Sequence, residues 1–311
     1  MKIIFFGSDD FALVNLEKLL AAPGHEIVAC VTQPDKPKGR GLKVTASPIK
    51  ECALEKKLPL FQPDKITDPA FISSLKEFQC DLFVVVAYGK ILPPEVLAIP
   101  YVCAMNVHAS LLPNYRGAAP INWAIVNGDE ETGVSIIKMN SQMDAGDIFS
   151  QAKCRIGPQD TAVTLRRTLA ELGAQLLVKT INTLEKNEYT LTAQDRRKVT
   201  LAPKLSRELG KIDWTISAQD IYNQVRGLLP WPGAFSVCQG KQVKVLDADV
   251  LADLASGAPP GEVVEIRPNG VVIAAGEGSL LVKKVHPESG KEMPASDLVS
   301  GYRITTGTRF S

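Results

Sequence analysis

Short, continuously apolar runs alternate with amphipathic stretches along the first two thirds of the chain. In the runs, apolar residues follow one another directly, whereas in the stretches they recur at helical spacing. Continuous apolar strands separated by helices are typical of a parallel sheet covered on both faces. We therefore predict a Rossmann-like, doubly wound, mostly parallel α/β domain. The expected strands are residues 1–6, 26–32, 81–87, 102–108, 134–139 and 148–155, and the expected helices are residues 11–22, 48–57, 69–78 and 161–186.

The pattern changes after the last of these helices. Residues 190–210 are polar and basic, and we interpret them as a linker between a catalytic domain, residues 1–189, and a second domain, residues 211–311. After a helix at residues 218–229, the second domain contains short apolar strands separated by Gly-containing turns, such as Gln239-Gly240 and Pro268-Asn269-Gly270, which are hairpin signals. This succession predicts a C-terminal OB-like β-barrel domain.

Composition and charge narrow the class of protein. With 45% hydrophobic and 22% charged residues, the chain resembles a globular protein. The start lacks a signal-peptide core and no apolar run approaches the roughly 20 residues that span a bilayer, so we expect a cytoplasmic protein. Six scattered cysteines without a C-x-x-C pair predict no metal, and the absence of heptads favours a monomer. A formal net charge of +1 argues against indiscriminate nucleic-acid binding but allows a local basic patch.

Candidate chemistry follows the strand expected at residues 102–108. Ligands of open α/β sheets bind beyond the carboxyl ends of the strands, and strand alternation places Asn106 and His108 on the same side. An Asn amide can donate a hydrogen bond to a developing oxyanion, and an imidazole exchanges protons near neutral pH. This pair suits acyl or formyl transfer.

A carboxylate is needed to orient such an imidazole. Asp144, in the sequence MDAGD between the last two expected strands, is the first candidate and Asp147 the second. Each of these residues also has a structural interpretation, because Asn and His often cap loops and an Asp beside Gly often forms a turn. Of the other two histidines, His25 precedes an expected strand without polar companions in the sequence and His286 lies in a Pro-flanked turn, so we expect neither to be a competitor.

The segments NVHASLLPNYRGAAPINWAI and TGVSIIKMNSQMDAGDI resemble the formyltransferase family, most closely its members that act on methionyl-tRNA. The matches TQPDKPKGRG, VVVAYGKILP and WPGAF extend the resemblance over nearly the whole chain. The resemblance implies that Asn106, His108 and Asp144 are catalytic and that 10-formyltetrahydrofolate is the formyl donor, bound without a metal. The folate-binding residues that it implies are Ser110, Leu111, Leu112, Pro113, Val86, Tyr88, Ile91 and Met139.

The formyl acceptor is a separate question, because relatives in this family use glycinamide ribonucleotide, nucleotide-linked amino sugars or water. Enzymes acting on glycinamide ribonucleotide carry a Gly-rich phosphate loop after the first strand. Here that position reads FFGSDDFA, and Asp9 and Asp10 would repel a phosphate. The sequence therefore argues against a phosphate at this loop.

A basic loop at residues 33–43, QPDKPKGRGLK, points to RNA. Basic loops bind RNA through phosphate contacts, although a short charge run is commonly only a solvated surface. In the resembling family the inserted loop contacts tRNA. The residues expected to bind tRNA are Lys36, Lys38, Arg40 and Lys43 in this loop and Arg196, Arg197 and Lys198 in the linker; Lys283, Lys284 and Arg303 are further candidates from charge alone.

Together these features predict transfer of the formyl group of 10-formyltetrahydrofolate to the amino group of initiator methionyl-tRNA, for translation initiation. Two alternatives stay open. One is a sugar-nucleotide formyltransferase, which can carry a similar C-terminal extension. The other is a catalytically silent RNA-binding protein built on a transferase core.

Overall fold

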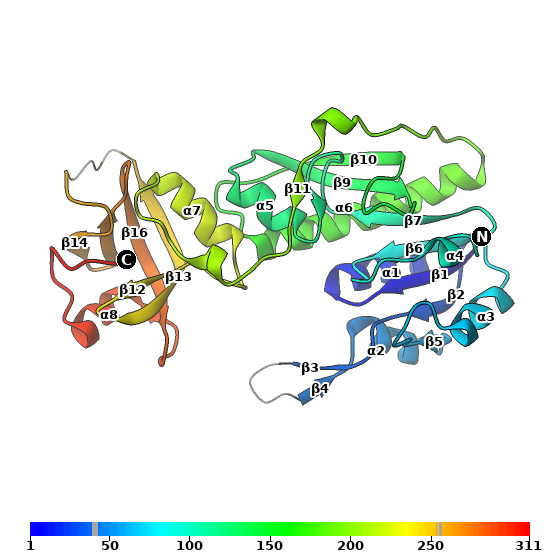
Figure 1. The fold of residues 1–311 in the computed structure, drawn as a ribbon, viewed down its shortest axis with the longest axis horizontal. Coiled ribbons are helices and arrows are strands. Elements are labelled where there is room, and N and C mark those ends of the chain that lie inside the picture. Colours follow the sequence, from blue (N-terminus) through cyan, green and yellow to red (C-terminus); the bar gives the residue numbers. More distant parts are fainter. Residues whose placement is uncertain (39–42, 253, 255–256) are drawn as a thin grey trace. The chain divides into compact units, whose positions relative to one another are not determined.

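A computed structural model describes residues 1–38, 43–252, 254 and 257–311, which form two compact units (Figure 1). The first unit comprises Met1–Pro120, Glu131–Arg155 and Arg166–Ala202. The second unit comprises Ile121–Glu130, Ile156–Leu165 and Pro203–Ser311. Two earlier segments of the chain therefore belong to the second unit. The boundaries expected at residues 189–190 and 210–211 stay predictions.

The first unit is built on a seven-stranded sheet with the order β10-β9-β7-β6-β1-β2-β5. The five strands from β7 to β5 run parallel, and β9 and β10 are antiparallel to their neighbours. The mostly parallel α/β fold expected from the sequence is confirmed. The strands are β1 (Lys2–Gly7), β2 (Glu26–Val31), β5 (Leu60–Phe61), β6 (Leu82–Val86), β7 (Cys103–His108), β9 (Glu131–Lys138) and β10 (Ile148–Arg155).

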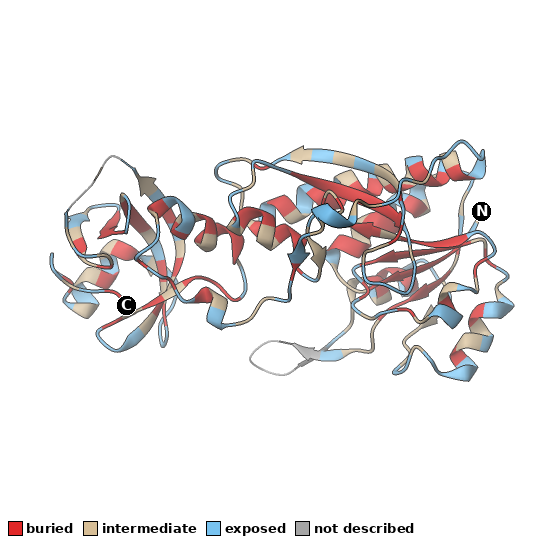
Figure 2. Ribbon diagram, turned by 45° about the horizontal axis from the view of Figure 1, so that its top comes forward, coloured by how far each residue is buried: buried red, intermediate tan, exposed pale blue. Residues whose placement is uncertain are grey.

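Helices cover both faces of this sheet, which leaves its central strands buried (Figure 2). On one face, Ile4 and Phe6 of β1 pack with Phe71 and Leu75 of α3 in a common core. On the other face, α1 and α2 pack together, and α6 lies with Gly173 against Val107 and Val134 of the sheet. Burial on both faces is why these strands are continuously apolar. The helices are α1 (Asp10–Ala21), α2 (Pro48–Glu55), α3 (Pro69–Glu77), α4 (Pro94–Leu97) and α6 (Ala162–Glu185).

Local sequence signals explain where these helices begin. The side chains of Asp9, Ser47 and Asp68 each accept a hydrogen bond from a backbone N–H in the first turn of α1, α2 and α3 respectively. Proline follows Ser47 and Asp68 directly, where its missing N–H costs the helix nothing. Over the described residues, no helix combines the length and apolar character needed to cross a membrane.

Two short pairings in the first unit were not anticipated. The basic loop forms a two-stranded hairpin of β3 (Lys36–Lys38) and β4 (Lys43–Thr45), with the residues between them, Arg40 included, outside the described residues. In addition, β8 (Arg116–Gly117) pairs in parallel with β11 (Leu201–Ala202). The second pairing joins the candidate active-site segment to residues that we interpreted as a linker.

The second unit contains an antiparallel sheet with the order β12-β13-β16-β15-β14, with β17 paired to β16. Its core includes Trp214, Ile221, Val245 and Leu280. Helix α7 packs on β13 and β16, and α8 packs on β15, β16 and β17. The elements are α7 (Ala218–Gly227), β12 (Phe235–Cys238), β13 (Lys241–Leu251), β14 (Val263–Arg267), β15 (Gly270–Ala274), β16 (Ser279–Pro287), β17 (Met293–Pro294) and α8 (Ala295–Tyr302).

Both hairpins expected in this unit are present. Gln239 and Gly240, between β12 and β13, have φ values of 50° and 76°, as a tight hairpin turn requires. The turn between β14 and β15 ends at Gly270, where a Cβ atom would lie 2.2 Å from the Val282 carbonyl oxygen. Only glycine fits this close approach of two backbones.

The expected OB-like barrel is not confirmed, because the sheet does not close through a continuous ladder among the described residues. Instead, the last residues of the chain reach both of its edges through isolated bridges. Phe310 pairs with Cys238 of β12, and Arg309 pairs with Glu262 beside β14. The C-terminal segment therefore links the two edge strands without forming a full strand.

Earlier chain segments are bound to α7 by partly buried polar contacts within the second unit. The guanidinium Nη1 of Arg226 donates hydrogen bonds to the carbonyl oxygens of Gly157 (3.2 Å) and Asp160 (2.9 Å). Within α5 (Pro120–Val126), the Asn122 amide donates to the Gly227 carbonyl oxygen at 2.7 Å. Such contacts between distant segments cannot be anticipated from periodicity.

Candidate active site

The end of β7 brings Asn106 and His108 to the carboxylate of Asp144, which lies in the loop between β9 and β10. The Asn106 Nδ2 atom is 3.4 Å from Asp144 Oδ1, and the His108 Nδ1 atom is 3.6 Å from the same oxygen. The three side chains singled out from the sequence therefore converge. It is Asp144, and not the second candidate Asp147, that pairs with the imidazole; Asp147 is exposed to solvent.

The His108 ring is 5% exposed and its two nitrogens face different partners. Its Nε2 atom lies 2.9 Å from the carbonyl oxygen of Tyr115. Because a carbonyl oxygen only accepts, Nε2 carries the proton in this contact, which makes Nδ1 the basic nitrogen of the neutral ring. That basic nitrogen is the one directed to Asp144, where a carboxylate stabilises the ring once Nδ1 gains a proton.

Asp144 is held by both its side chain and its backbone. Its Oδ2 atom accepts a hydrogen bond from the Gly117 N–H at 2.9 Å, and its carbonyl oxygen accepts one from the Gln194 amide at 2.8 Å. Asp144 has a φ of 52°, a left-handed conformation that is uncommon for residues other than glycine. Two residues later, a Cβ atom at Gly146 would lie 1.7 Å from the Lys138 carbonyl oxygen, so this loop requires glycine there.

The segment from Ser110 to Pro113 is fixed by a buried hydrogen-bond network around Ser135 of β9. The Ser135 hydroxyl donates to the Ser110 carbonyl oxygen at 2.6 Å and accepts from the Leu112 N–H at 3.0 Å and the Gln151 amide at 2.8 Å. Gln151 also donates to the Leu112 carbonyl oxygen at 2.9 Å. These hydrogen bonds satisfy the polar groups of the network, so the segment from Ser110 to Pro113 is held rigidly next to His108.

The residues expected to bind folate differ in how far they are exposed to solvent. Val86, Tyr88, Ser110 and Leu112 are buried, whereas Ile91 is 70% exposed. Leu111, Pro113 and Met139 are partly exposed. The apolar side chains of Ile91, Leu111, Pro113 and Met139 are thus the ones that a flat heteroaromatic ring could contact, whereas the buried residues lie behind them.

Tyr88 is the most unusual of these residues. Its ring packs edge-on against Phe6, and burial raises the pKa of its hydroxyl to about 12. Its backbone carbonyl oxygen accepts a hydrogen bond of 2.6 Å from the Gln33 amide, at the base of the basic hairpin. The segment after β6 is thereby tied to the segment after β2.

The loop after β1 presents a carboxylate where a phosphate-binding enzyme presents backbone N–H groups. Asp9 caps α1 by accepting a hydrogen bond from the Ala12 N–H and also pairs with Arg166. A carboxylate already occupies the positive end of this helix. The arrangement agrees with the inference that no phosphate binds here.

The basic residues expected to contact tRNA lie in two separate segments of the chain. Lys36 donates to Gln33 at 2.6 Å, while Lys38 and Lys43 are described only by their backbone positions in β3 and β4. Arg196, Arg197 and Lys198 form a short 3-10 helix, η1, and all three are exposed to solvent.

The basic residues expected to assist in the second unit include two that already have acidic partners. Lys283 pairs with Asp247 and Asp249, at 3.2 and 2.9 Å, and Lys284 pairs with Glu292 at 2.6 Å. These ion pairs partly neutralise the charge that an RNA phosphate would meet. Contact of both lysines with tRNA stays a prediction, and their acidic partners make it weaker than their charge alone suggested.

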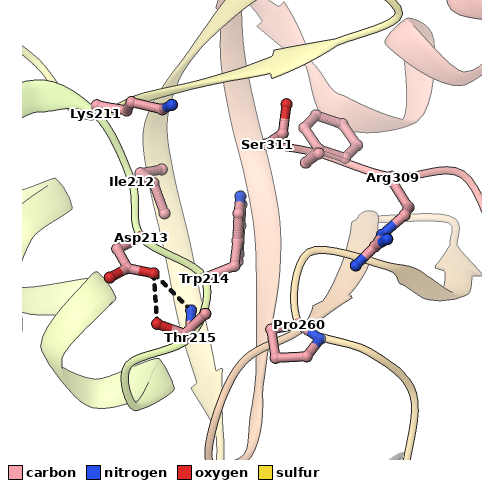
Figure 3. A pocket seen from close by; sticks show the side chains of 9 residues that line it. Lys211, Ile212, Asp213, Trp214, Thr215, Pro260, Arg309 and Ser311 are labelled. Carbon is pink, nitrogen blue, oxygen red and sulfur yellow. Dashed lines mark hydrogen bonds between the residues drawn. The ribbon is translucent and has the colours of Figure 1, made fainter.

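The second unit also contains a hollow of about 640 Å³ (Figure 3). Lys211 and Arg309 line it together with Asp213 and the C-terminal Ser311, so cations and anions are mixed. Hydrogen bonds from Thr215 hold the pKa of the Asp213 carboxyl below its usual range. None of the residues singled out from the sequence lines this hollow.

Sequence reasoning missed the residues that hold the site together. Gly117, Ser135 and Gln194 each bind the backbone or carboxylate of a site residue. Gly117 stood in a recognised segment, but nothing in the pattern around Ser135 or Gln194 distinguishes it from other polar residues. Among the described residues, no cluster of three His, Cys, Asp or Glu side chains is arranged to hold a metal ion.

Comparison with known families gives two matches in the sequence. A model described as "Formyl transferase" matches residues 1–181, and a model described as "Formyl transferase, C-terminal domain" matches residues 204–303. Curated relatives align over the full length. The methionyl-tRNA formyltransferase of Desulforamulus reducens is 42% identical over 99% of this chain and 97% of the relative. That of Symbiobacterium thermophilum is 46% identical over 100% of this chain and 95% of the relative.

Solved structures share the fold at lower identity. An N-formyltransferase from Helicobacter canadensis, solved with folinic acid and dTDP-3-aminofucose, is 18% identical with a TM-score of 0.68 over 91% of this chain and 99% of its own. HypX from Aquifex aeolicus, solved with tetrahydrofolic acid, is 18% identical with a TM-score of 0.64 over 98% of this chain. This chain spans 48% of HypX. At such identities the likeness establishes the fold alone.

Proposed function

This chain belongs to the formyl transferase family, and on that premise we propose that it transfers the formyl group of 10-formyltetrahydrofolate to the amino group of initiator methionyl-tRNA. The observation that carries the proposal is the convergence of Asn106, His108 and Asp144 at the end of β7. It supplies a hydrogen-bond donor, a base and an orienting carboxylate in one place. The full-length relatives named for the same reaction support the choice of acceptor.

Asn106 stabilises the charge that develops during transfer. The donor supplies the electrophilic formyl carbon, and attack by the methionyl amine places negative charge on the formyl oxygen. The Asn106 amide donates a hydrogen bond to that oxygen. Its present contact with Asp144, at 3.4 Å, is at the long end of the hydrogen-bond range, so the amide gives up little when it turns to an oxyanion.

His108 accepts the proton that the attacking amine loses. Nδ1 is the basic atom, because Nε2 already donates to the Tyr115 carbonyl oxygen. Asp144 then stabilises the doubly protonated ring from 3.6 Å, and the Tyr115 carbonyl oxygen keeps the ring in one orientation. The same proton returns to the nitrogen of tetrahydrofolate that leaves the formyl carbon.

The acceptor is selected by basic residues outside this trio. Lys36, Lys38, Arg40 and Lys43 of the hairpin segment and the exposed η1 residues would contact RNA phosphates, which bind through the sum of charges. Asp9 at the start of α1 disfavours a phosphate in the loop after β1. An acceptor that takes part in translation implies a cytoplasmic enzyme. We expect it to act as a monomer.

An acceptor assay tests the proposal. The protein is incubated with 10-formyltetrahydrofolate and either methionyl-tRNA or a dTDP-linked amino sugar, and the formylated product is measured. We expect formyl transfer to initiator methionyl-tRNA only. Transfer to the sugar nucleotide would establish the alternative transferase, and tRNA binding without any transfer would establish a silent RNA-binding protein.

A further inference from the structure

Gln194 joins the two segments that carry the candidate catalytic groups. Its Nε2 atom donates to the carbonyl oxygens of Asp144 (2.8 Å) and Gly146 (2.7 Å). Its Oε1 atom accepts from Nε (3.0 Å) and Nη2 (2.7 Å) of Arg116. Both N–H groups and both lone pairs of this amide are therefore in use, and all its partners lie in the Asp144 loop or in β8.

We propose that Gln194 is a positioning residue for formyl transfer, which acts by holding the Asp144 loop against the segment of Arg116 and Gly117. It touches no reacting atom. Its effect passes through the backbone of Asp144 to the carboxylate that pairs with His108. The inference rests on the proposed function for its catalytic consequence, but the structural role stands on these contacts.

The Asp144 loop needs such a support because its backbone adopts an unfavourable conformation. Asp144 holds a φ of 52°, a left-handed conformation that a residue with a Cβ atom seldom adopts unless its surroundings favour it. The Gln194 side-chain amide stabilises this conformation, because it donates hydrogen bonds to the carbonyl oxygens of Asp144 and Gly146. Without it, we expect the turn to relax and the carboxylate to move away from His108.

Other residues of the same segment brace the neighbouring parts of the site. The hydroxyl of Thr200 accepts from the N–H of Tyr115 at 2.8 Å, and Tyr115 supplies the carbonyl oxygen that His108 faces. The Ala202 carbonyl oxygen accepts from Ala118 at 2.9 Å, directly after Gly117. Residues 194–202 therefore support both partners of the His108 ring, and Gln194 is the member of this segment that reaches the carboxylate loop.

The test compares two replacements with a matched control. Gln194→Met keeps the volume and removes every hydrogen bond. Gln194→Glu can still accept from Arg116 but cannot donate to the two carbonyl oxygens. Gln142→Met changes an exposed glutamine in the same β9–β10 connection. For each folded variant, kcat and the KM for methionyl-tRNA are measured, with circular dichroism to give the folded fraction.

We expect both Gln194 variants to lower kcat on the order of 10²-fold with little change in KM, since a displacement near 1 Å has this effect on a reacting geometry. Gln142→Met should behave as wild type. Unchanged kcat in the Gln194 variants would overturn the proposal. A loss of activity that only follows the folded fraction would also overturn it, because that is the behaviour of a purely structural residue.

Amide hydrogen exchange at Gly117 gives a second readout that does not depend on activity. The Gly117 N–H is protected by the Asp144 carboxylate, so its exchange in Gln194→Met should accelerate well above wild type while amides of β1 keep their rates. Unchanged exchange at Gly117 would refute the positioning role. A wild-type protein that fails to formylate methionyl-tRNA would refute the proposed function instead, and the exchange experiment would still decide the role of Gln194.

Discussion

The catalytic trio and the basic residues expected to bind tRNA obey different physical rules. His108 is 5% exposed and each of its ring nitrogens has a partner. The Arg197 side chain, by contrast, is 89% exposed, and its two side-chain hydrogen bonds go to Asp195, the residue that caps the same short helix. A buried, fully paired group acts through its exact placement, while an exposed charge acts through its contribution to a sum. The comparison teaches that rate and acceptor affinity should respond to separate sets of substitutions.

Removing the base should have the largest effect. We expect His108→Ala to lower kcat by about 10²- to 10⁴-fold, the usual contribution of a positioned proton acceptor, and to leave the dissociation constant for methionyl-tRNA unchanged. Steady-state formylation and filter binding measure the two quantities. His25→Ala, elsewhere in the first unit, is the matched control. Near-normal turnover in His108→Ala would remove this residue from the mechanism.

Removing the Ser135 hydroxyl, which is hydrogen-bonded to the segment from Ser110 to Pro113, should lower the stability of the fold. Ser135→Ala leaves the Ser110 carbonyl oxygen and the Leu112 N–H without their buried partner, which we expect to cost about 1–3 kcal/mol in the free energy of unfolding. Urea denaturation of this variant and of Ser141→Ala, an exposed serine of the next loop, measures the difference. Equal midpoints would show that the network around Ser135 contributes no net stability.

Removing basic charge from the loop at residues 33–43 should act on affinity alone. In the double variant Lys38→Ala, Arg40→Ala we expect weaker tRNA binding and a salt dependence reduced by roughly one unit of logarithmic slope for each lost phosphate contact. Folate binding should not change. The pair Lys57→Ala, Lys76→Ala, which removes two exposed lysines elsewhere, is the control. A salt slope equal to that of wild type would show that Lys38 and Arg40 do not contact RNA phosphates.

The smallest effect should be on the pH dependence of the free energy of unfolding, through cysteines buried in the core of the first unit. Burial raises the pKa of the Cys30 thiol to about 12 and that of Cys103 to about 11, against 9.0 for a free thiol. Between pH 9 and 11 the unfolded chain loses these protons and the folded chain keeps them, so the free energy of unfolding falls as pH rises. Cys30→Ala should reduce that slope, by up to about 1.4 kcal/mol per pH unit. Identical slopes in wild type and variant would contradict burial of this thiol.

Periodicity predicted the elements of the fold because most of them are decided locally. Continuous apolar runs mark the buried strands, and Asp9 and Ser47 mark the starts of α1 and α2. The antiparallel direction of β9 and the docking of Asn122 on Gly227 depend on contacts between distant segments, which no local pattern records. The closed barrel was expected from strand spacing, which carries no information on how the edges of a sheet meet.

In the candidate site, too, the parts that depend on local sequence could be predicted and the parts that depend on distant contacts could not. Asn106 and His108 are two residues apart on one strand, so their common direction follows from alternation. Asp144 was only the first of two candidate carboxylates, with Asp147 the second, because the approach of either to His108 depends on the register of β7 with β9. Gln194 was placed in a polar linker, and its role appears only when the loop that it binds is folded beside it.

Single-turnover formylation with enzyme in excess over methionyl-tRNA tests the separation of chemistry from acceptor binding most directly. The Lys38→Ala, Arg40→Ala variant should need more enzyme for saturation and then reach the wild-type rate constant, whereas His108→Ala should saturate at the wild-type concentration and stay slow. A rate constant at saturation that is more than about tenfold lower in the basic variant, a loss of more than about 1.4 kcal/mol, would contradict the separation.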